Sequence, residues 1–332
     1  MIITKPAYFD TFRCIADKCE DACCKEWAVQ VDDASAAYYR SLPGDLGNRL
    51  RQVLVEEDGE TVMRIENGRC PMWRNDGLCR IQAELGEEAL CHTCAQFPRL
   101  THDYGDFTEL GLELSCPEAA RIILSAPGLP PISREEEGGE GTYDREAMDV
   151  LKATRQTALA ILEDPAWDVP TALALLLLYG CQAQSELDCG EMEDFDPESA
   201  LVSAKELAKA GDPQAVLAYF SGLEILADSW KQRLANPETA PWDERIRKIA
   251  GYFINRYWLQ AVSDYDLYSR VKFTVISCLT IHLLGGDMVQ TAQRYSKEIE
   301  NSIENVESIL DAAYECPAFT DDKLLGMLIK TT

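Results

Sequence analysis

Cysteines are concentrated near the amino-terminal end of this chain, and they constrain its fold more than any other feature. The stretch CIADKCEDACCKEW, residues 14–27, holds four cysteines with acidic residues between them. Nine of the thirteen cysteines lie between Cys14 and Cys116. The number of cysteines is odd, and the first residues of the chain do not resemble an export signal. Both observations argue against a disulfide framework and for metal or redox use. The other four are scattered and are expected to act as small hydrophobic residues: Cys181, Cys189, Cys278 and Cys316.

The charge and the apolar pattern restrict the partners that we expect. The first residues, MIITKPAYFDTF, lack the basic head and apolar core of a signal peptide, and the longest apolar run covers only residues 172–179. We therefore expect a cytoplasmic protein that does not enter the membrane. The formal net charge of −26 repels phosphate backbones, so we expect no nucleic-acid partner. The same charge would attract a lysine-rich protein surface, although a solubilising acidic coat explains it equally well.

Composition divides the 332-residue chain into three parts. Residues 1–127 form a cysteine-rich module, and residues 128–142 combine prolines, glycines and an acidic run typical of a linker. Residues 143–332 form a helical domain. Apolar spacing, with Asp or Pro at several starts, predicts helices at residues 142–164, 171–184, 197–210, 213–236, 242–261, 265–284 and 288–315.

Strand signals are confined to the first module. WAVQVD, residues 27–32, alternates apolar and polar residues, and the pair Asn67-Gly68 between apolar segments is typical of a hairpin. A second turn is predicted at Asp76-Gly77. We therefore predict a mainly α protein, in which a small irregular cysteine-rich metal-binding module with one or two short hairpins precedes a helical domain.

Grouped thiolates are ligands for zinc and for iron–sulfur clusters, because several soft anionic donors can converge on one cation. Cys19 and Cys23 are four residues apart, so a helix or turn would present both sulfurs to one side. The adjacent pair Cys23-Cys24 is awkward for one tetrahedral zinc, because neighbouring side chains of an extended segment point in opposite directions. Ligands spread along the chain favour an iron–sulfur cluster over zinc. Buried reduced thiols without metal are the remaining alternative.

Several enzyme signatures are missing from the sequence. No G-x-G-x-x-G follows a strand, and there is no P-loop, G-x-S-x-G or H-E-x-x-H. The radical S-adenosylmethionine spacing C-x₃-C-x₂-C fails, because Glu26 occupies its third position. Composition and spacing alone therefore predict no more than a metal–cysteine module attached to a helical domain.

Four blocks of the sequence resemble a known family. Three lie in the first module: YFDTFRCIADKCEDACCKEWAVQVD, GRCPMWRNDGLCRIQAELGEEALCHTCAQFPR and ELSCPEAARIIL. The fourth is AQRYSKEIENSIENVESIL, residues 292–310. Together they resemble the flagellin lysine N-methylase family, and the amino-terminal half is also similar to small metal-chelating proteins of the CxxCxxCC type. Residues 128–252 show no such match.

The resemblance implies methyl transfer from S-adenosylmethionine to surface lysine side chains of flagellin. It also implies an iron–sulfur cluster, of the 4Fe–4S type, with zinc as the alternative metal. Cys91 departs from the family pattern, which has a small hydroxyl residue there, and Ala16 stands where the family tends to have glycine. The implied metal ligands are the eight cysteines that match the pattern: Cys14, Cys19, Cys23, Cys24, Cys70, Cys79, Cys94 and Cys116.

Six other residues in or beside these blocks are candidates for the site. Tyr295 and Glu298, three residues apart in the YSKEIE motif, are the catalytic candidates. Glu298 would attract the lysine ammonium and Tyr295 would orient the amine. Core packing, surface ion pairs and helix capping are the structural alternatives for all six. The cofactor-binding candidates are Trp27, Arg99, Arg121 and Asn301.

Two other classes of function remain open. The chain could be a non-enzymatic metal-binding or iron–sulfur scaffold, or a redox sensor whose adjacent thiols oxidise under stress. The block at residues 292–310 favours the enzyme, because a chelating module alone has no use for it. No standard motif places the S-adenosylmethionine site.

Overall fold

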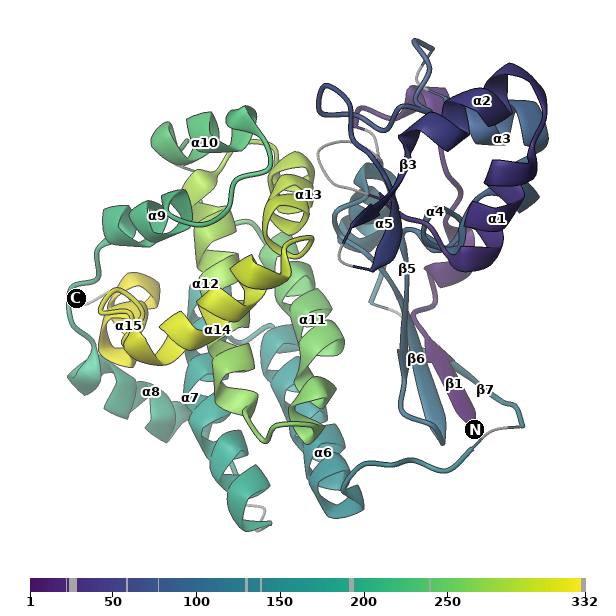
Figure 1. Cartoon of the computed structure of the whole chain (residues 1–332). Helices are drawn as coiled ribbons and strands as arrows, with labels where there is room; N and C mark the ends of the chain where they lie inside the picture. The colour runs from purple at the N-terminus through teal and green to yellow at the C-terminus, as the bar shows by residue number, and fades with distance from the viewer. Residues whose placement is uncertain are drawn as a thin grey trace.

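The computed structural model describes residues 1–21, 23, 29–57, 59–76, 78–128, 131–137, 139–190, 194–238 and 240–329. It is 59% helical, with short strands, which confirms the predicted mainly α class. Figure 1 shows a mixed amino-terminal half beside a helical half. The predicted domain boundaries stay a prediction. Contacts cross the first boundary, since α5 (Pro117–Ser125) packs against helices of the second half.

The amino-terminal half contains more regular structure than its sequence predicted. Four short helices surround a small core built around Tyr39, Leu50 and Met72. Each is too short for its apolar spacing to stand out in the sequence. Their bounds are α1 Asp33–Ser41, α2 Gly44–Val53, α3 Arg80–Leu85 and α4 His92–Gln96.

Two sheets complete this half. A three-stranded sheet has the order β2-β4-β3, from β2 (Val29–Gln30), β4 (Glu60–Met63) and β3 (Leu54–Glu57). A four-stranded sheet has the order β5-β6-β1-β7, with β1 parallel to β6 and antiparallel to β7. Its strands are β5 Arg99–Asp103, β6 Phe107–Leu112, β1 Ile2–Lys5 and β7 Ile132–Glu135.

The first predicted turn is present. Asn67 and Gly68 have φ of 52° and 71°, and Glu66 pairs with Arg69 across them, as the Asn-Gly turn of a hairpin requires. At the second predicted turn, Gly77 lies outside the described residues; on either side of it, Trp73 pairs with Cys79. The predicted linker is not entirely without regular structure. It contains β7, which pairs with β1 as an exposed edge strand of the sheet.

The helical half consists of α6 to α15. The predicted helix at residues 142–164 is α6, and Asp144 caps its start by accepting from Ala147 N at 3.1 Å. The 3₁₀ helix η4 (Trp258–Val262) and helix α15 lie among them. The bounds are α6 Arg145–Glu163, α7 Val169–Cys189, α8 Pro197–Leu207, α9 Pro213–Ser221, α10 Asp228–Ala235, α11 Arg245–Tyr257, α12 Leu267–Leu284, α13 Met288–Ile299, α14 Ile303–Glu315 and α15 Asp321–Leu328.

Two long predicted helices are split in the structure. The stretch 213–236 forms α9 and α10, and the stretch 288–315 forms α13 and α14. The second break has a clear cause, because the Ser302 side chain accepts from Asn305 N and starts a new helix. Asn301 is thereby left in the turn between α13 and α14.

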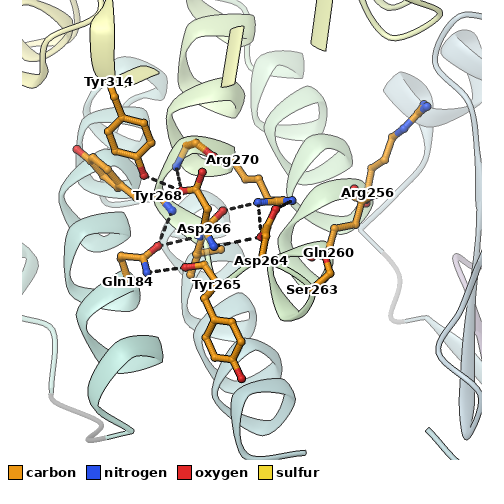
Figure 2. A network of polar contacts seen from close by, with 12 residues as sticks. Gln184, Arg256, Gln260, Ser263, Asp264, Tyr265, Asp266, Tyr268, Arg270 and Tyr314 are labelled. Atoms are coloured by element: carbon orange, nitrogen blue, oxygen red, sulfur yellow. Dashed lines mark hydrogen bonds and ion pairs between the residues drawn. The ribbon is translucent and has the colours of Figure 1, made fainter. Parts of the chain in front are cut away.

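Helix α12 is the central helix of this half. It is long and apolar enough to cross a membrane, but 89% of its 18-residue apolar window is buried inside the molecule, as in the core helix of a bundle. Figure 2 shows how its start is held: Gln184 of α7 accepts from Leu267 N and Tyr268 N at 2.8 and 2.9 Å. Asp266 accepts from Ser269 N and from the Tyr314 hydroxyl.

The two halves meet where α5 lies against α11 and α13 (Figure 1). Lys248 of α11 donates to Leu124 O and Ala126 O at the end of α5, where a cation complements the helix carbonyls. Farther along, Arg155 of α6 forms a two-pronged ion pair with Glu109 of β6, at 2.6 and 2.7 Å. The cysteine-rich segments therefore sit on a rigid frame made by both halves.

Candidate functional site

Thiols that are far apart in the sequence influence one another in the folded chain. Burial is the main cause that raises the pKa of Cys116 to about 12, and the Cys19 and Cys23 thiols make smaller contributions. Burial likewise raises the pKa of Cys79, to which Cys23 and Cys91 contribute. Cys23 is thus an electrostatic neighbour of thiols from three other segments of the chain.

Cys91 belongs with these thiols, although the family pattern gave no reason to include it. It is buried, and its hydrogen bond with Cys94 lowers the pKa of Cys91 to about 7 and raises the pKa of Cys94. Cys79 and Cys23 also act on Cys94. Its spacing of three residues from Cys94 was the sequence signal that could have kept it in the set.

Within the described ranges, no group of three or more His, Cys, Asp or Glu side chains is close enough to hold a metal ion as placed. Cys24 lies outside these ranges, so the set of eight is not described in full. Of the other seven, Cys14 and Cys23 are exposed, Cys70 and Cys116 are buried, and Cys19, Cys79 and Cys94 are intermediate. The donor chemistry is the kind that a soft metal centre uses, because thiols from several separate segments can serve as thiolate ligands of zinc or of an iron–sulfur cluster.

Helix α13 holds the cysteine segment in place through Asp21. Lys297 Nζ lies 2.8 Å from Asp21 Oδ2, and the two side chains are 2% and 7% exposed. Gln293 donates to the same oxygen at 3.3 Å and to Ser115 O at 2.7 Å. Asp21 lies between Cys19 and Cys23, while Ser115 precedes Cys116. The carboxy-terminal block therefore fixes two cysteine segments relative to each other.

A cavity of about 270 Å³ lies at the junction of the two halves, and Thr93 and Gln96 on either side of Cys94 line it. Its walls come from three of the four sequence blocks that resemble the family. The block around Cys94 supplies four residues, the block that contains Cys116 supplies Glu113, and the carboxy-terminal block supplies Asn301. The lining residues are Thr93, Gln96, Phe97, Arg99, Glu113 and Asn301.

A buried network of charges backs this cavity. Arg256 Nη1 lies 3.3 Å from Glu300 Oε1 and 3.8 Å from Glu113 Oε1, so one guanidinium serves two carboxylates. Glu300 is fully buried and also accepts from the Tyr252 and Tyr257 hydroxyls. Burial raises the pKa of Glu113, with Arg256 opposing and Glu300 adding to the shift. The cavity wall thus carries a carboxylate whose charge is only partly compensated.

The cofactor-binding candidates separate into different positions. Arg99 and Asn301 both line the cavity, which brings together two residues that are two hundred positions apart. Arg121 is exposed on α5 and pairs with Glu118 at 2.6 and 2.8 Å, as a surface ion pair. Trp27 lies outside the described residues.

The catalytic candidates lie inside the helical core. Tyr295 is fully buried among Phe220, Trp230 and Phe253, and its hydroxyl is 2.8 Å from Ser277 Oγ. Glu298 is also fully buried and accepts from Leu226 N at 2.8 Å. Neither residue lines the cavity, and the catalytic assignment of both stays a prediction.

A second cavity, of about 440 Å³, contains none of the residues predicted for the site. It lies between α6, α7 and the start of α8, and Trp167, Tyr179 and Phe195 form part of its wall. Among the described residues, its lining contains no thiol and no residue of the four blocks. We therefore take the smaller cavity next to the cysteines as the candidate site.

Glu113, Asp21 and Arg256 are the functional candidates that sequence reasoning missed. Glu113 and Asp21 lie in the resembled blocks, within three residues of a cysteine, which was the available signal. Arg256 lies outside the blocks and gave no signal, because only the packing of α11 against α5 brings it to Glu113.

Comparison with known proteins finds relatives for part of the chain. It is 33% identical over 140 residues to a lysine-N-methylase from Salmonella typhimurium and to one from Salmonella choleraesuis, which covers 40% of this chain and 35% of each relative. The chain thus spans about a third of the length of these two. It is 34% identical over 132 residues to the flagellar biosynthetic protein FliU of Salmonella muenchen, covering 38% of this chain and 78% of FliU.

No family model matches the chain, and no solved structure matches it. The match to FliU nevertheless covers most of that protein at an identity that establishes common ancestry and a common fold. The two lysine-N-methylases match at a similar identity. The chain belongs to the flagellin lysine N-methylase family.

Proposed function

We propose that this protein transfers methyl groups from S-adenosylmethionine to the side-chain nitrogens of flagellin lysines in the cytoplasm. The observation that carries the proposal is the convergence of three family-like blocks on one cavity beside the thiols. The relatives named lysine-N-methylase and FliU support the reaction and the substrate. A scaffold without activity would not need a polar cavity at the junction of its two halves.

The reaction itself makes few demands on the protein. S-adenosylmethionine supplies an electrophilic methyl group, and the neutral lysine nitrogen forms the new N–C bond as the C–S bond breaks with its electron pair staying on sulfur. The chain must hold the two reactants in line and exclude water from them. Because lysine titrates near pKa ~10.4 in water, the site must also favour the neutral amine. The wall of the cavity, fixed by α4, β5 and the α13–α14 turn, provides the rigid positioning.

We further propose that the thiols around Cys23 hold an iron–sulfur cluster, with zinc as the alternative metal. Cys19, Cys79, Cys94 and Cys116 are its electrostatic neighbours from separate segments. A bound cluster would supply a covalent tie between these segments and so fix the wall of the cavity. Asp21 and its partners on α13 hold the same segments from outside.

The test is mass spectrometry of flagellin co-expressed with this protein, which should show lysines carrying added methyl groups. Cys23→Ser should abolish the modification, and Cys189→Ser, at an exposed cysteine far from the module, should leave it unchanged. Metal and sulfide analysis of anaerobically purified protein distinguishes an iron–sulfur cluster from zinc. Unmodified flagellin with metal-replete wild-type protein would refute the proposed function.

A further inference from the structure

We propose that the cavity between α4, Glu113 and Asn301 binds the amino-acid end of S-adenosylmethionine, with Arg99 receiving its carboxylate and Glu113 its ammonium group. This inference rests on the proposed function. It assigns a place to the methyl donor, for which the sequence holds no recognised motif. It also gives Glu113 a role as a binding residue.

The size of the cavity fits one end of the donor. Pockets that enclose a drug-sized ligand measure about 300–1,000 Å³. A cavity of about 270 Å³ is therefore too small for the whole molecule and large enough for a group of the size of methionine. The adenosine part would lie outside it.

The charges of the wall match a zwitterion. The six lining residues include one guanidinium, at Arg99, and one carboxylate, at Glu113. They lie on neighbouring strand ends, because Arg99 pairs with Leu112 in the sheet and Glu113 N donates to Pro98 O at 2.7 Å. A free amino-acid group carries one negative and one positive charge, and the two residues offer one charge complementary to each. A lysine side chain alone would leave Arg99 without a complementary group.

Both charged residues are placed to accept such a ligand. The Arg99 guanidinium lies over the Phe12 ring, 5.4 Å from its centroid, and a stacked guanidinium keeps its in-plane N–H groups available for a carboxylate. The Glu113 side chain is 13% exposed, and its closest cation, Arg256, is 3.8 Å away and nearer to Glu300. An ammonium group entering the cavity would complete the pairing of Glu113.

The uncharged residues add directional contacts. Thr93, Gln96 and Asn301 contribute a hydroxyl and two amides to the same wall. Amides and hydroxyls can donate to a carboxylate and accept from an ammonium group. Gln96 and Thr93 flank Cys94 on α4, so a metal centre that includes Cys94 would also fix the position of these groups.

The inference is tested by calorimetry with two unreactive probes. S-adenosylhomocysteine keeps the amino-acid end, and 5′-methylthioadenosine lacks it. Wild-type protein should bind the first about tenfold or more tightly than the second, since a charge-assisted pair contributes this much. Arg99→Gln and Glu113→Gln should each remove most of this difference and leave the binding of 5′-methylthioadenosine unchanged. Glu135→Gln, on the exposed strand β7, is the matched control and should change neither affinity.

A measurement on wild-type protein guards against variants that do not fold. N-acetylated S-adenosylhomocysteine lacks the ammonium group and should lose most of the advantage over 5′-methylthioadenosine. Two outcomes would overturn the inference and leave the proposed function standing. One is that wild type binds the three probes with equal affinity. The other is that the variants weaken the binding of S-adenosylhomocysteine and of 5′-methylthioadenosine equally. If wild type binds none of the probes and modifies no flagellin, the proposed function fails as well.

Discussion

Asp32 connects two helices of the cysteine-rich half through a single carboxylate. Its Oδ1 accepts from Ser35 N at the start of α1, and its Oδ2 accepts from His92 N at the start of α4, both at 2.9 Å. These hydrogen bonds, first that from His92, lower the pKa of Asp32 to about 2. Because α4 carries Cys94 and part of the cavity wall, this contact sets the position of the site.

We expect Asp32→Ala to lower the free energy of unfolding by about 1–2 kcal/mol at neutral pH, the usual cost of losing a helix cap. The folded pKa lies below the unfolded value of about 3.9, so the stabilisation is present above that pH and is lost as the pH falls toward 2. Denaturant titrations between pH 2 and 7 measure this. Asp33→Ala, one residue along, is the control, and equal pH dependence of the two variants would contradict the role of Asp32.

Ala16 adopts a backbone conformation that favours glycine. Its φ is +49°, in the left-handed region, where an alanine Cβ costs about 1 kcal/mol. We therefore expect Ala16→Gly to raise the free energy of unfolding by up to about 1 kcal/mol, reduced by the greater freedom of glycine in the unfolded chain. Chemical denaturation measures the change, with Ala36→Gly in α1 as a destabilising control. A less stable Ala16→Gly protein would contradict this expectation.

For single residues, the sequence indicated which side chains to consider better than it indicated where they lie in the fold. Arg99 and Asn301 could be proposed because they lie in recognisable blocks, and both line the cavity. Tyr295 and Glu298 lie in an equally recognisable block, but their helix turns them into the core. Helical spacing shows which residues share a face and does not show whether that face meets the core or a cavity.

At the scale of the element, α13 explains why the chain carries its carboxy-terminal block. Gln293 and Lys297, four residues apart, lie on one face of α13 and both contact Asp21 of the cysteine segment. The ion pair is almost completely buried. Removing one member of a buried pair leaves the other charge without its partner, which is far more costly than the loss of a surface pair.

We expect Lys297→Met to lower the free energy of unfolding by about 3 kcal/mol and to increase the reactivity of the Cys19 and Cys23 thiols in the reduced, metal-free protein. Adding Asp21→Asn should restore part of the stability, because it removes the uncompensated charge. Thiol modification followed by mass spectrometry measures the reactivity. Lys209→Met is the control, since Lys209 forms an exposed pair with Asp322. Unchanged reactivity in Lys297→Met would show that α13 does not hold the segment.

Helix starts were more predictable than helix ends. Asp144, Asp196 and Asp212 each precede a helix and accept a hydrogen bond from its first turn, as their sequence positions suggested. The breaks inside 213–236 and 288–315 were missed because the apolar pattern continues across them. Helix α15 and the five helices α1 to α5 of the first half were missed because they are short, and tertiary packing stabilises them rather than their own pattern.

At the scale of the whole molecule, two separate hydrophobic cores determine where the site can form. The buried residues of β6 and α5, with Cys116, belong to the large core of the helices. Cys70 and Cys91 belong to the small core around Tyr39, and Cys79 and Cys94 pack against it. Long-range pairings such as β1 with β6 and β7 could not be read from local pattern, because β1 is only four residues long and its partners are a hundred positions away. Topology of this kind is specified by the core and not by periodicity.

The net charge of −26 acts over the whole surface, and its consequence for substrate binding is testable. If the acidic field attracts the lysine-bearing surface of flagellin, the KM for flagellin should rise several-fold between about 0.05 and 0.5 M salt, because salt shortens the screening length from more than 10 Å to a few ångströms. The kcat should change little, since contacts within the site are screened much less. Binding of S-adenosylhomocysteine, which carries no net charge, should be nearly independent of salt and is the internal control. A constant KM across this range would mean that the acidic surface serves only to keep the protein in solution.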